Sequence, residues 1–92
     1  MTQKKLYNDL ASVFKRLHEN NHDTRAAKQL ETLALEVGKY SAKNNQDDAL
    51  SEAHKQLINA YAEIHQAQED KQACSAGLRK VVTALDLLKE NA

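Results

Sequence analysis

The residues best suited to chemistry are two histidines in the first quarter of the chain. His18 and His22 flank Glu19 in the pattern H-E-x-x-H, which on one helix presents two zinc ligands and a glutamate that activates water. The two asparagines between the histidines favour a helix end over a helix middle, and only an unsupported choice such as Glu36 could supply a third ligand. We therefore expect a solvated helix terminus here, with no catalytic residue, metal or other cofactor.

A third histidine suggests a different reaction. His54 lies in the segment Ser51-Glu52-Ala53-His54-Lys55, which resembles the surroundings of the phosphorylated histidine in lactose-type phosphotransferase carrier subunits. The resemblance implies phosphoryl relay through a neutral, exposed imidazole beside a docking surface. The second histidine-rich segment typical of that family is missing from the sequence. The alternative, which we prefer, is a surface histidine at the edge of an apolar stripe.

Four amphipathic helices would have to position these side chains. Apolar residues recur in steps of three and four, the period of a helix with one buried face, and predict helices over about residues 3–19 and 24–43 and two more beyond residue 47. We expect Tyr7, Phe14, Ile58 and Tyr61 to widen the apolar faces. The central core positions are Leu6, Leu10, Val13 and Leu17; Ala26, Leu30, Leu33, Val37 and Tyr40; Leu50, Ala53, Leu57, Ala60 and Ile64; and Cys74, Leu78, Val81, Leu85 and Leu88.

Polar residues mark the expected breaks. The segment 20–24 is rich in cap formers, so Asp23 or Thr24 should cap the second helix. Gly38 lies inside that helix, where glycine costs about 1 kcal/mol relative to alanine, which predicts close approach of a neighbouring helix. Asn44 and Asn45 end the pattern, and Asp47 and Asp48 favour the start of a third helix.

Two architectures fit the second half of the chain. Residues 65–73 contain no Gly, Pro or Asn, and an apolar heptad register runs from Leu50 to Leu88. A turn near Glu69 and Asp70 predicts an all-α fold, an antiparallel four-helix bundle in a single domain 1–92. The alternative is three helices, with one long C-terminal helix over residues 47–91 that forms a coiled-coil dimer. The protein would be a monomer in the first case and a homodimer in the second.

Charge and composition limit the partners. The chain of 92 residues has 13 basic and 13 acidic side chains, so it lacks the net positive charge that drives nucleic-acid binding. Residues 1–46 carry a net charge of +3 and residues 47–92 one of −3, so we expect the basic half, including Lys4, Lys5, Lys15 and Arg16, to pair with the acidic half. A single Cys74, expected to be buried, fits a reducing cytoplasm, and we expect no signal peptide or membrane span.

The segment Lys5-Leu6-Tyr7-Asn8-Asp9-Leu10, together with the four-helix layout, resembles the immunity proteins of class IIa (pediocin-like) bacteriocins, especially the enterocin A immunity group. The resemblance implies a non-enzymatic cytoplasmic protein that protects the producer cell from a pore-forming peptide by engaging a bacteriocin-bound membrane sugar permease. It also implies recognition through the C-terminal half, where the candidate partner-binding residues are Arg79, Lys80, Asp86 and Lys89. The alternatives are a helical adaptor or dimerisation module, and a His-dependent phosphocarrier or metal-binding protein.

Overall fold

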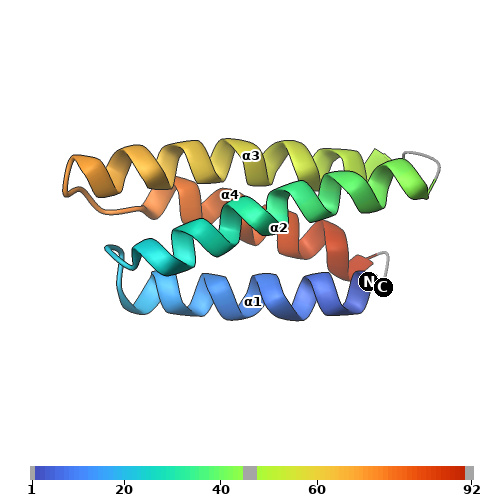
Figure 1. The fold of residues 1–92 in the computed structure, drawn as a ribbon, viewed down its shortest axis with the longest axis horizontal. Helices are drawn as coiled ribbons and strands as arrows, with labels where there is room; N and C mark the ends of the chain where they lie inside the picture. Colours follow the sequence, from blue (N-terminus) through green and yellow to red (C-terminus); the bar gives the residue numbers. More distant parts are fainter. Residues whose placement is uncertain (1, 45–47, 91–92) are drawn as a thin grey trace.

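The computed structural model describes residues 2–44 and 48–90, and within these ranges all regular structure is α-helical. The helices are α1 (Gln3–Glu19), α2 (Thr24–Lys43), α3 (Asp48–Glu69) and α4 (Ser75–Glu90). The predicted bounds of the first two helices are confirmed, and so is the all-α four-helix bundle (Figure 1). Asn45 and Asp47, which were expected to take part in the second break, lie outside the described residues.

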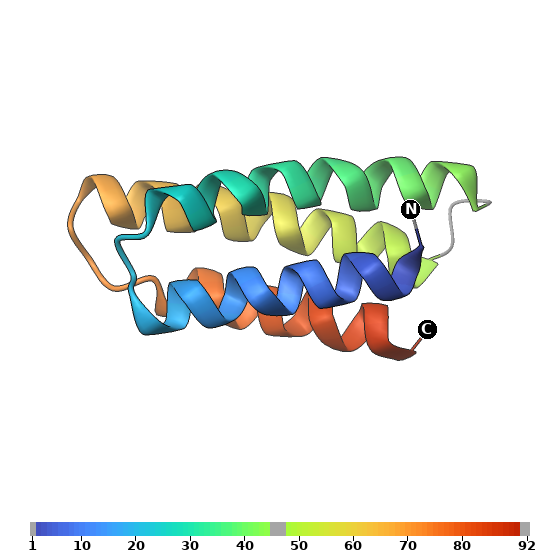
Figure 2. The same ribbon diagram turned by 60° about the horizontal axis from the view of Figure 1, so that its bottom comes forward.

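The four helices form a ring in which each one packs against two others. α1 lies beside α2 and α4, and α3 lies beside the same two helices. The chain reverses direction at every connection, so neighbouring helices are antiparallel (Figures 1 and 2). The α1–α2 and α3–α4 turns meet at one end of a rod that measures 39 × 18 × 18 Å. None of the described helices is long and apolar enough to cross a membrane.

One core runs the length of this rod, built from the apolar stripes of all four helices. The predicted central positions are buried except Tyr40 and Leu85, which pack against the core from its edge. Tyr7, Phe14 and Tyr61 also lie at this edge, as expected. Ile58 is different, because 45% of its surface is exposed, so the prediction that it widens the buried face of α3 is wrong. The helix turns 100° per residue, which carries Ile58 out of the stripe centred on Leu57.

The helix ends explain why the breaks fall where they do. Thr2 caps α1 by accepting a hydrogen bond from the Lys5 amide, and Asp23 caps α2 by accepting one from the Ala26 amide at 2.9 Å. A side-chain oxygen at this position satisfies an amide that has no partner inside the helix. The predicted cap at Asp23 is therefore confirmed.

α3 ends at Glu69, and the alternative of one long C-terminal helix is wrong. The Gln72 amide donates to the Ala67 carbonyl at 2.8 Å and the Lys71 amide donates to the Gln68 carbonyl at 3.2 Å. Together these bonds form a Schellman motif, in which the first residue after the helix cap adopts a left-handed conformation. Lys71 takes that position with φ 57°, where glycine is the usual residue. The sequence therefore lacks the glycine that usually indicates such a helix end.

Gly77 lies where α4 packs directly against α3. A Cβ atom at this position would lie 2.4 Å from Cγ1 of Ile64 and 3.1 Å from the carbonyl oxygen of Ala60. Both distances are shorter than van der Waals contact, so only glycine lets the start of α4 rest on α3 at this separation. The helical apolar pattern predicts such an approach at Gly38, whereas nothing around Gly77 in the sequence indicates it.

Candidate functional site

The helix that carries His18 ends one residue later, which separates the two histidines of the H-E-x-x-H segment. α1 ends at Glu19, and the backbone of Asn20 is extended. The Asn20 side chain accepts a hydrogen bond from the His22 amide at 3.0 Å, so His22 lies in the turn while His18 stacks on Phe14 within the helix. The two imidazoles do not share a helical face, and the described residues contain no group of three or more His, Cys, Asp or Glu placed to hold a metal. The predicted helix terminus is confirmed.

His54 lies in the seam between α2 and α3. Its Nδ1 atom is 2.8 Å from the carbonyl oxygen of Ala34, and because a carbonyl can only accept, Nδ1 carries the hydrogen. The ring covers Gly38, where a Cβ atom would lie 2.6 Å from Cε1 of His54. The predicted close approach at Gly38 is therefore confirmed, with an imidazole as the approaching group. His54 is half-buried and holds two helices together, in contrast to the exposed imidazole that phosphoryl relay requires.

The four candidate partner-binding residues of α4 fall into two groups. Arg79, Asp86 and Lys89 are exposed on the outer face of the helix, on the same stripe as Val82, which is 40% exposed. Lys80 points to the neighbouring helix instead and forms an ion pair with Glu63 of α3. Three of the four side chains are thus exposed to solvent, and the fourth links α4 to α3.

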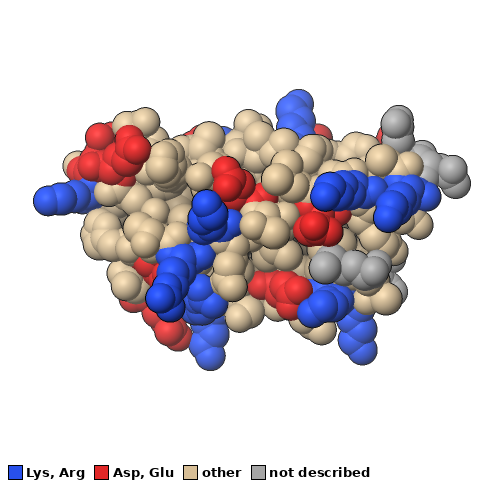
Figure 3. Space-filling model, in the orientation of Figure 1, with Lys and Arg blue, Asp and Glu red and all other residues tan. Residues whose placement is uncertain are grey.

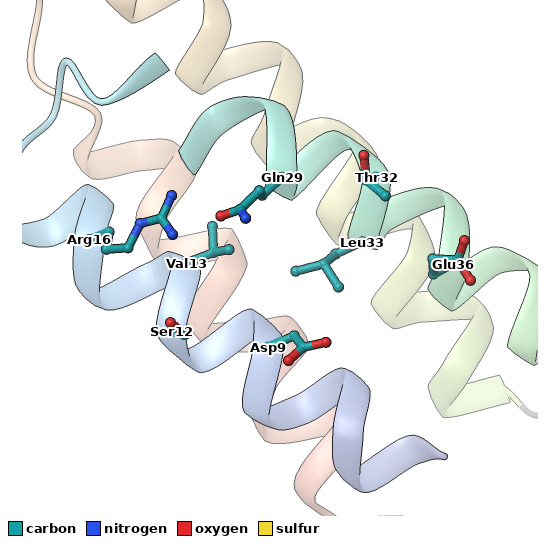
Figure 4. A pocket seen from close by; sticks show the side chains of 8 residues that line it. All are labelled: Asp9, Ser12, Val13, Arg16, Gln29, Thr32, Leu33 and Glu36. Carbon is teal, nitrogen blue, oxygen red and sulfur yellow. The ribbon is translucent and has the colours of Figure 1, made fainter. Parts of the chain in front are cut away.

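Sequence reasoning missed a furrow along the seam between α1 and α2. Its central hollow has a volume of about 390 Å³. Val13 and Leu33 point into it and form an apolar floor, while Arg16 and Gln29 face each other across one end (Figure 4). The remaining lining residues are Asp9, Ser12, Thr32 and Glu36. Such an apolar floor with polar walls suits the binding of an amphipathic group from a partner.

The furrow continues toward both ends of α2. Arg16 and Gln29 also line a hollow beside the α1–α2 turn, and Glu36 also lines one near Tyr40. The basic residues of these outer hollows are Arg25 and Lys28 at one end and Lys39 and Lys43 at the other. Figure 3 shows this distribution as Lys and Arg side chains toward the two ends of α2, with acidic ones between them. The periodicity of the sequence cannot show this feature, since it depends on the angle at which α2 crosses α1.

The predicted pairing of the basic half with the acidic half is wrong for Lys5 and Arg16. The Nζ atom of Lys5 lies 3.4 Å from Oδ2 of Asp9, one turn further along α1. The Nε atom of Arg16 lies 3.8 Å from Oδ2 of Asp23, at the start of α2. Both carboxylates belong to the basic half of the chain. Lys5 and Asp9 meet because residues four apart on a helix are neighbours, and Arg16 meets Asp23 because the short α1–α2 turn brings the end of α1 next to the start of α2.

At one end of the rod, Asn21 joins the two turns. Its side-chain oxygen accepts a hydrogen bond from the Cys74 amide at 3.0 Å, and its carbonyl accepts one from the Gln68 side chain at 3.0 Å. The Cys74 thiol donates to the same carbonyl at 3.3 Å and is buried, as predicted. Burial raises the pKa of the Cys74 thiol, so the uncharged form predominates in the folded protein.

Tyr61 provides the second perturbed group, at the α2–α3 seam. Partial burial raises its pKa, and the nearby negative charge of Glu31 and a hydrogen bond to that carboxylate raise it further. The ring also stacks on His65 with 5.7 Å between centroids. A neutral phenol in contact with a carboxylate acts here as a hydrogen-bonding link between helices.

In comparisons with known proteins, no family model, curated protein or solved structure matches this chain. The fold and the surface geometry therefore carry the functional argument. They define the class of a small helical bundle with a furrow between α1 and α2 and a mixed apolar and charged face on α4.

Proposed function

We propose that this chain is a non-enzymatic binding protein that recognises another protein through its exposed helix faces. The observation that carries the proposal is the outer stripe of α4, where Val82 lies among Arg79, Asp86 and Lys89. In such a patch the apolar side chain would supply affinity and the charged side chains around it would supply specificity.

The most concrete form of this function is bacteriocin immunity in the cytoplasm of a producer cell, with a bacteriocin-bound sugar permease as the partner. The helix count and the Leu6-Tyr7-Asn8-Asp9-Leu10 segment support it by resemblance. In this chain Leu6 and Leu10 of that segment belong to the core and Tyr7 packs at its edge.

Protection of a sensitive cell tests the proposal directly. The chain is expressed in a bacteriocin-sensitive strain, which is then challenged with a panel of pediocin-like peptides. We expect protection against at least one peptide, and unchanged sensitivity to all of them would contradict the immunity function.

Matched variants test the assignment to α4. Arg79→Glu and Val82→Asp alter the outer stripe, whereas Lys15→Glu makes the same charge change on an exposed position of α1. We expect the α4 variants to lose at least ten-fold in protection while Lys15→Glu remains active, with helicity measured by circular dichroism as a folding control. Equal loss in all three variants would remove α4 as the recognition surface.

A further inference from the structure

Two exposed apolar side chains lie on neighbouring helices. Leu35 on α2 and Ile58 on α3 are 56% and 45% exposed. Among the described residues, Val82 on α4 is the only other large apolar side chain that is exposed. Single exposed apolar residues are ordinary on protein surfaces. Two that adjoin each other need an explanation.

The alignment of the two helices places them at the same level. Three contacts across the seam define that alignment: Glu31 with Tyr61, Gly38 with His54, and Ser41 with Ser51. In each pair the residue numbers add up to the same total, as they must in an antiparallel pair of helices with one register. By the same rule Leu35 is level with Leu57, and Ile58 follows within about 1.5 Å along the axis. Leu35 and Ile58 therefore form one apolar patch in the middle of the α2–α3 face.

The patch extends over half-buried rings beside it. His54 and Tyr61 lie in the seam next to Ile58, and Gly38, which the His54 ring partly covers, presents no side chain beside Leu35. Leu35 and Ile58 themselves are therefore bordered by uncharged groups, and the nearest exposed charge is Lys55, three residues before Ile58 on α3.

Two charges on α2, Glu31 and Lys39, are placed so that they complement each other across a two-fold axis. Glu31 precedes Leu35 by four residues and Lys39 follows it by four, so they lie about one turn to either side. A two-fold axis that sets Leu35 against its copy puts Glu31 of each chain at the level of Lys39 of the other. Among the described residues Lys39 has no carboxylate within 4.0 Å, so its charge is available for such a pair.

We propose that the α2–α3 face binds a second copy of this chain in an antiparallel, two-fold dimer centred on Leu35 and Ile58. Isologous contacts of this kind are the commonest way in which soluble proteins associate. The inference concerns a different face from the α4 stripe and does not depend on the proposed function.

The size of the face sets the expected strength. One side of a rod 39 Å long and 18 Å wide offers at most about 700 Å² per chain, which is near the lower end of the range for specific interfaces. We expect a dimer that dissociates on dilution, with a dissociation constant in the micromolar range or weaker.

Sedimentation equilibrium of the full chain over a wide concentration range tests the dimer. Wild type is expected to shift from monomer to dimer as its concentration rises. Leu35→Asp should weaken the association at least ten-fold, because it places a carboxylate in the apolar centre of both copies. Val82→Asp makes the same kind of change on α4 and should leave the dimer intact.

Charge reversal tests the two-fold geometry itself. Glu31→Lys alone sets lysine against lysine, and Lys39→Glu alone sets glutamate against glutamate, so each should weaken the dimer. The double variant Glu31→Lys, Lys39→Glu restores opposite charges across the axis and should recover association. Thermal unfolding of each variant checks that loss of the Glu31 contact with Tyr61 has not unfolded the chain.

The proposal fails if wild type remains monomeric at millimolar concentration, which would leave the patch to a different protein. It also fails if Val82→Asp weakens the dimer as much as Leu35→Asp does, or if the double reversal recovers nothing.

Discussion

Asn21 connects two turns that are 53 residues apart in the chain. Its side chain accepts from the Cys74 amide, and its carbonyl accepts from the Gln68 side chain and the Cys74 thiol. When a partly buried amide loses its acceptor, the folded state still carries the desolvation free energy of that amide with no hydrogen bond to offset it. The Oδ1 atom of Asn21 thereby fixes the position of the residue that precedes α4.

Replacing that oxygen should destabilise the protein. Asn21→Ala leaves the Cys74 amide without its acceptor, and we expect a loss of about 1–3 kcal/mol in the free energy of unfolding. Asn21→Asp keeps an acceptor and should retain most of the stability. Urea denaturation measures the difference, with Asn20→Ala as the matched control, because its only side-chain bond, to the His22 amide, is exposed. An equal loss for Asn20→Ala and Asn21→Ala would show that the link between the turns contributes nothing.

At the scale of helices, the end of α3 decides the architecture. The heptad register continues past this point, and only the conformation of the chain at Lys71 turns it back onto the bundle. A left-handed residue other than glycine costs about 1–2 kcal/mol, so packing of α4 onto α3 must exceed this cost. Gly77 helps by allowing the two helices to approach closely.

Lys71→Gly should relieve the strain. Glycine adopts a positive φ freely, and we expect a net gain of about 1 kcal/mol in the free energy of unfolding after its greater freedom in the unfolded chain is counted. Chemical denaturation measures this gain. Gln72→Gly, one residue further, should destabilise or have no effect. Destabilisation by Lys71→Gly would mean that α3 does not end in a left-handed residue.

Across the whole molecule, packing contributes more to stability than charge does. The ion pairs found among the described residues are Lys5 with Asp9, Arg16 with Asp23, His65 with Glu69, and Lys80 with Glu63. Each lies within one half of the chain and is partly exposed, so each contributes at most about 1 kcal/mol. The halves are joined instead by the shared core. Burial raises the pKa of Cys74 within this core, and burial together with the Glu31 carboxylate raises the pKa of Tyr61 at its edge.

Stability should therefore fall in alkali. A raised pKa means that the folded state holds the proton where the unfolded state releases it, so the contribution is complete below the ordinary values of 9.0 for cysteine and 10.0 for tyrosine. It is lost as the pH rises through the raised values of the folded protein. Urea unfolding from pH 7 to 11 should show a shallower decline for Tyr61→Phe and Cys74→Ala than for wild type. Parallel curves would contradict this assignment.

Much of this molecule is encoded locally. The spacing of apolar residues predicts the helices and the core, since a side chain's place on a helix depends only on its position in the 3.6-residue repeat. Cap formers such as Asp23 predict a boundary for the same local reason. The helix end that separates His18 from His22 is likewise visible in the two asparagines between them.

Other features depend on how the helices meet. The contact of Asn21 with Cys74, the left-handed Lys71 and the furrow between α1 and α2 arise from the angles and registers at which helices pack, and no short stretch of sequence contains both partners. The same is true of the patch at Leu35 and Ile58, because the repeat along one helix cannot show what lies level with it on the next. Which residues of a helix face the core follows from the sequence of that helix alone, whereas which residues of two helices lie next to each other is decided only when the bundle assembles.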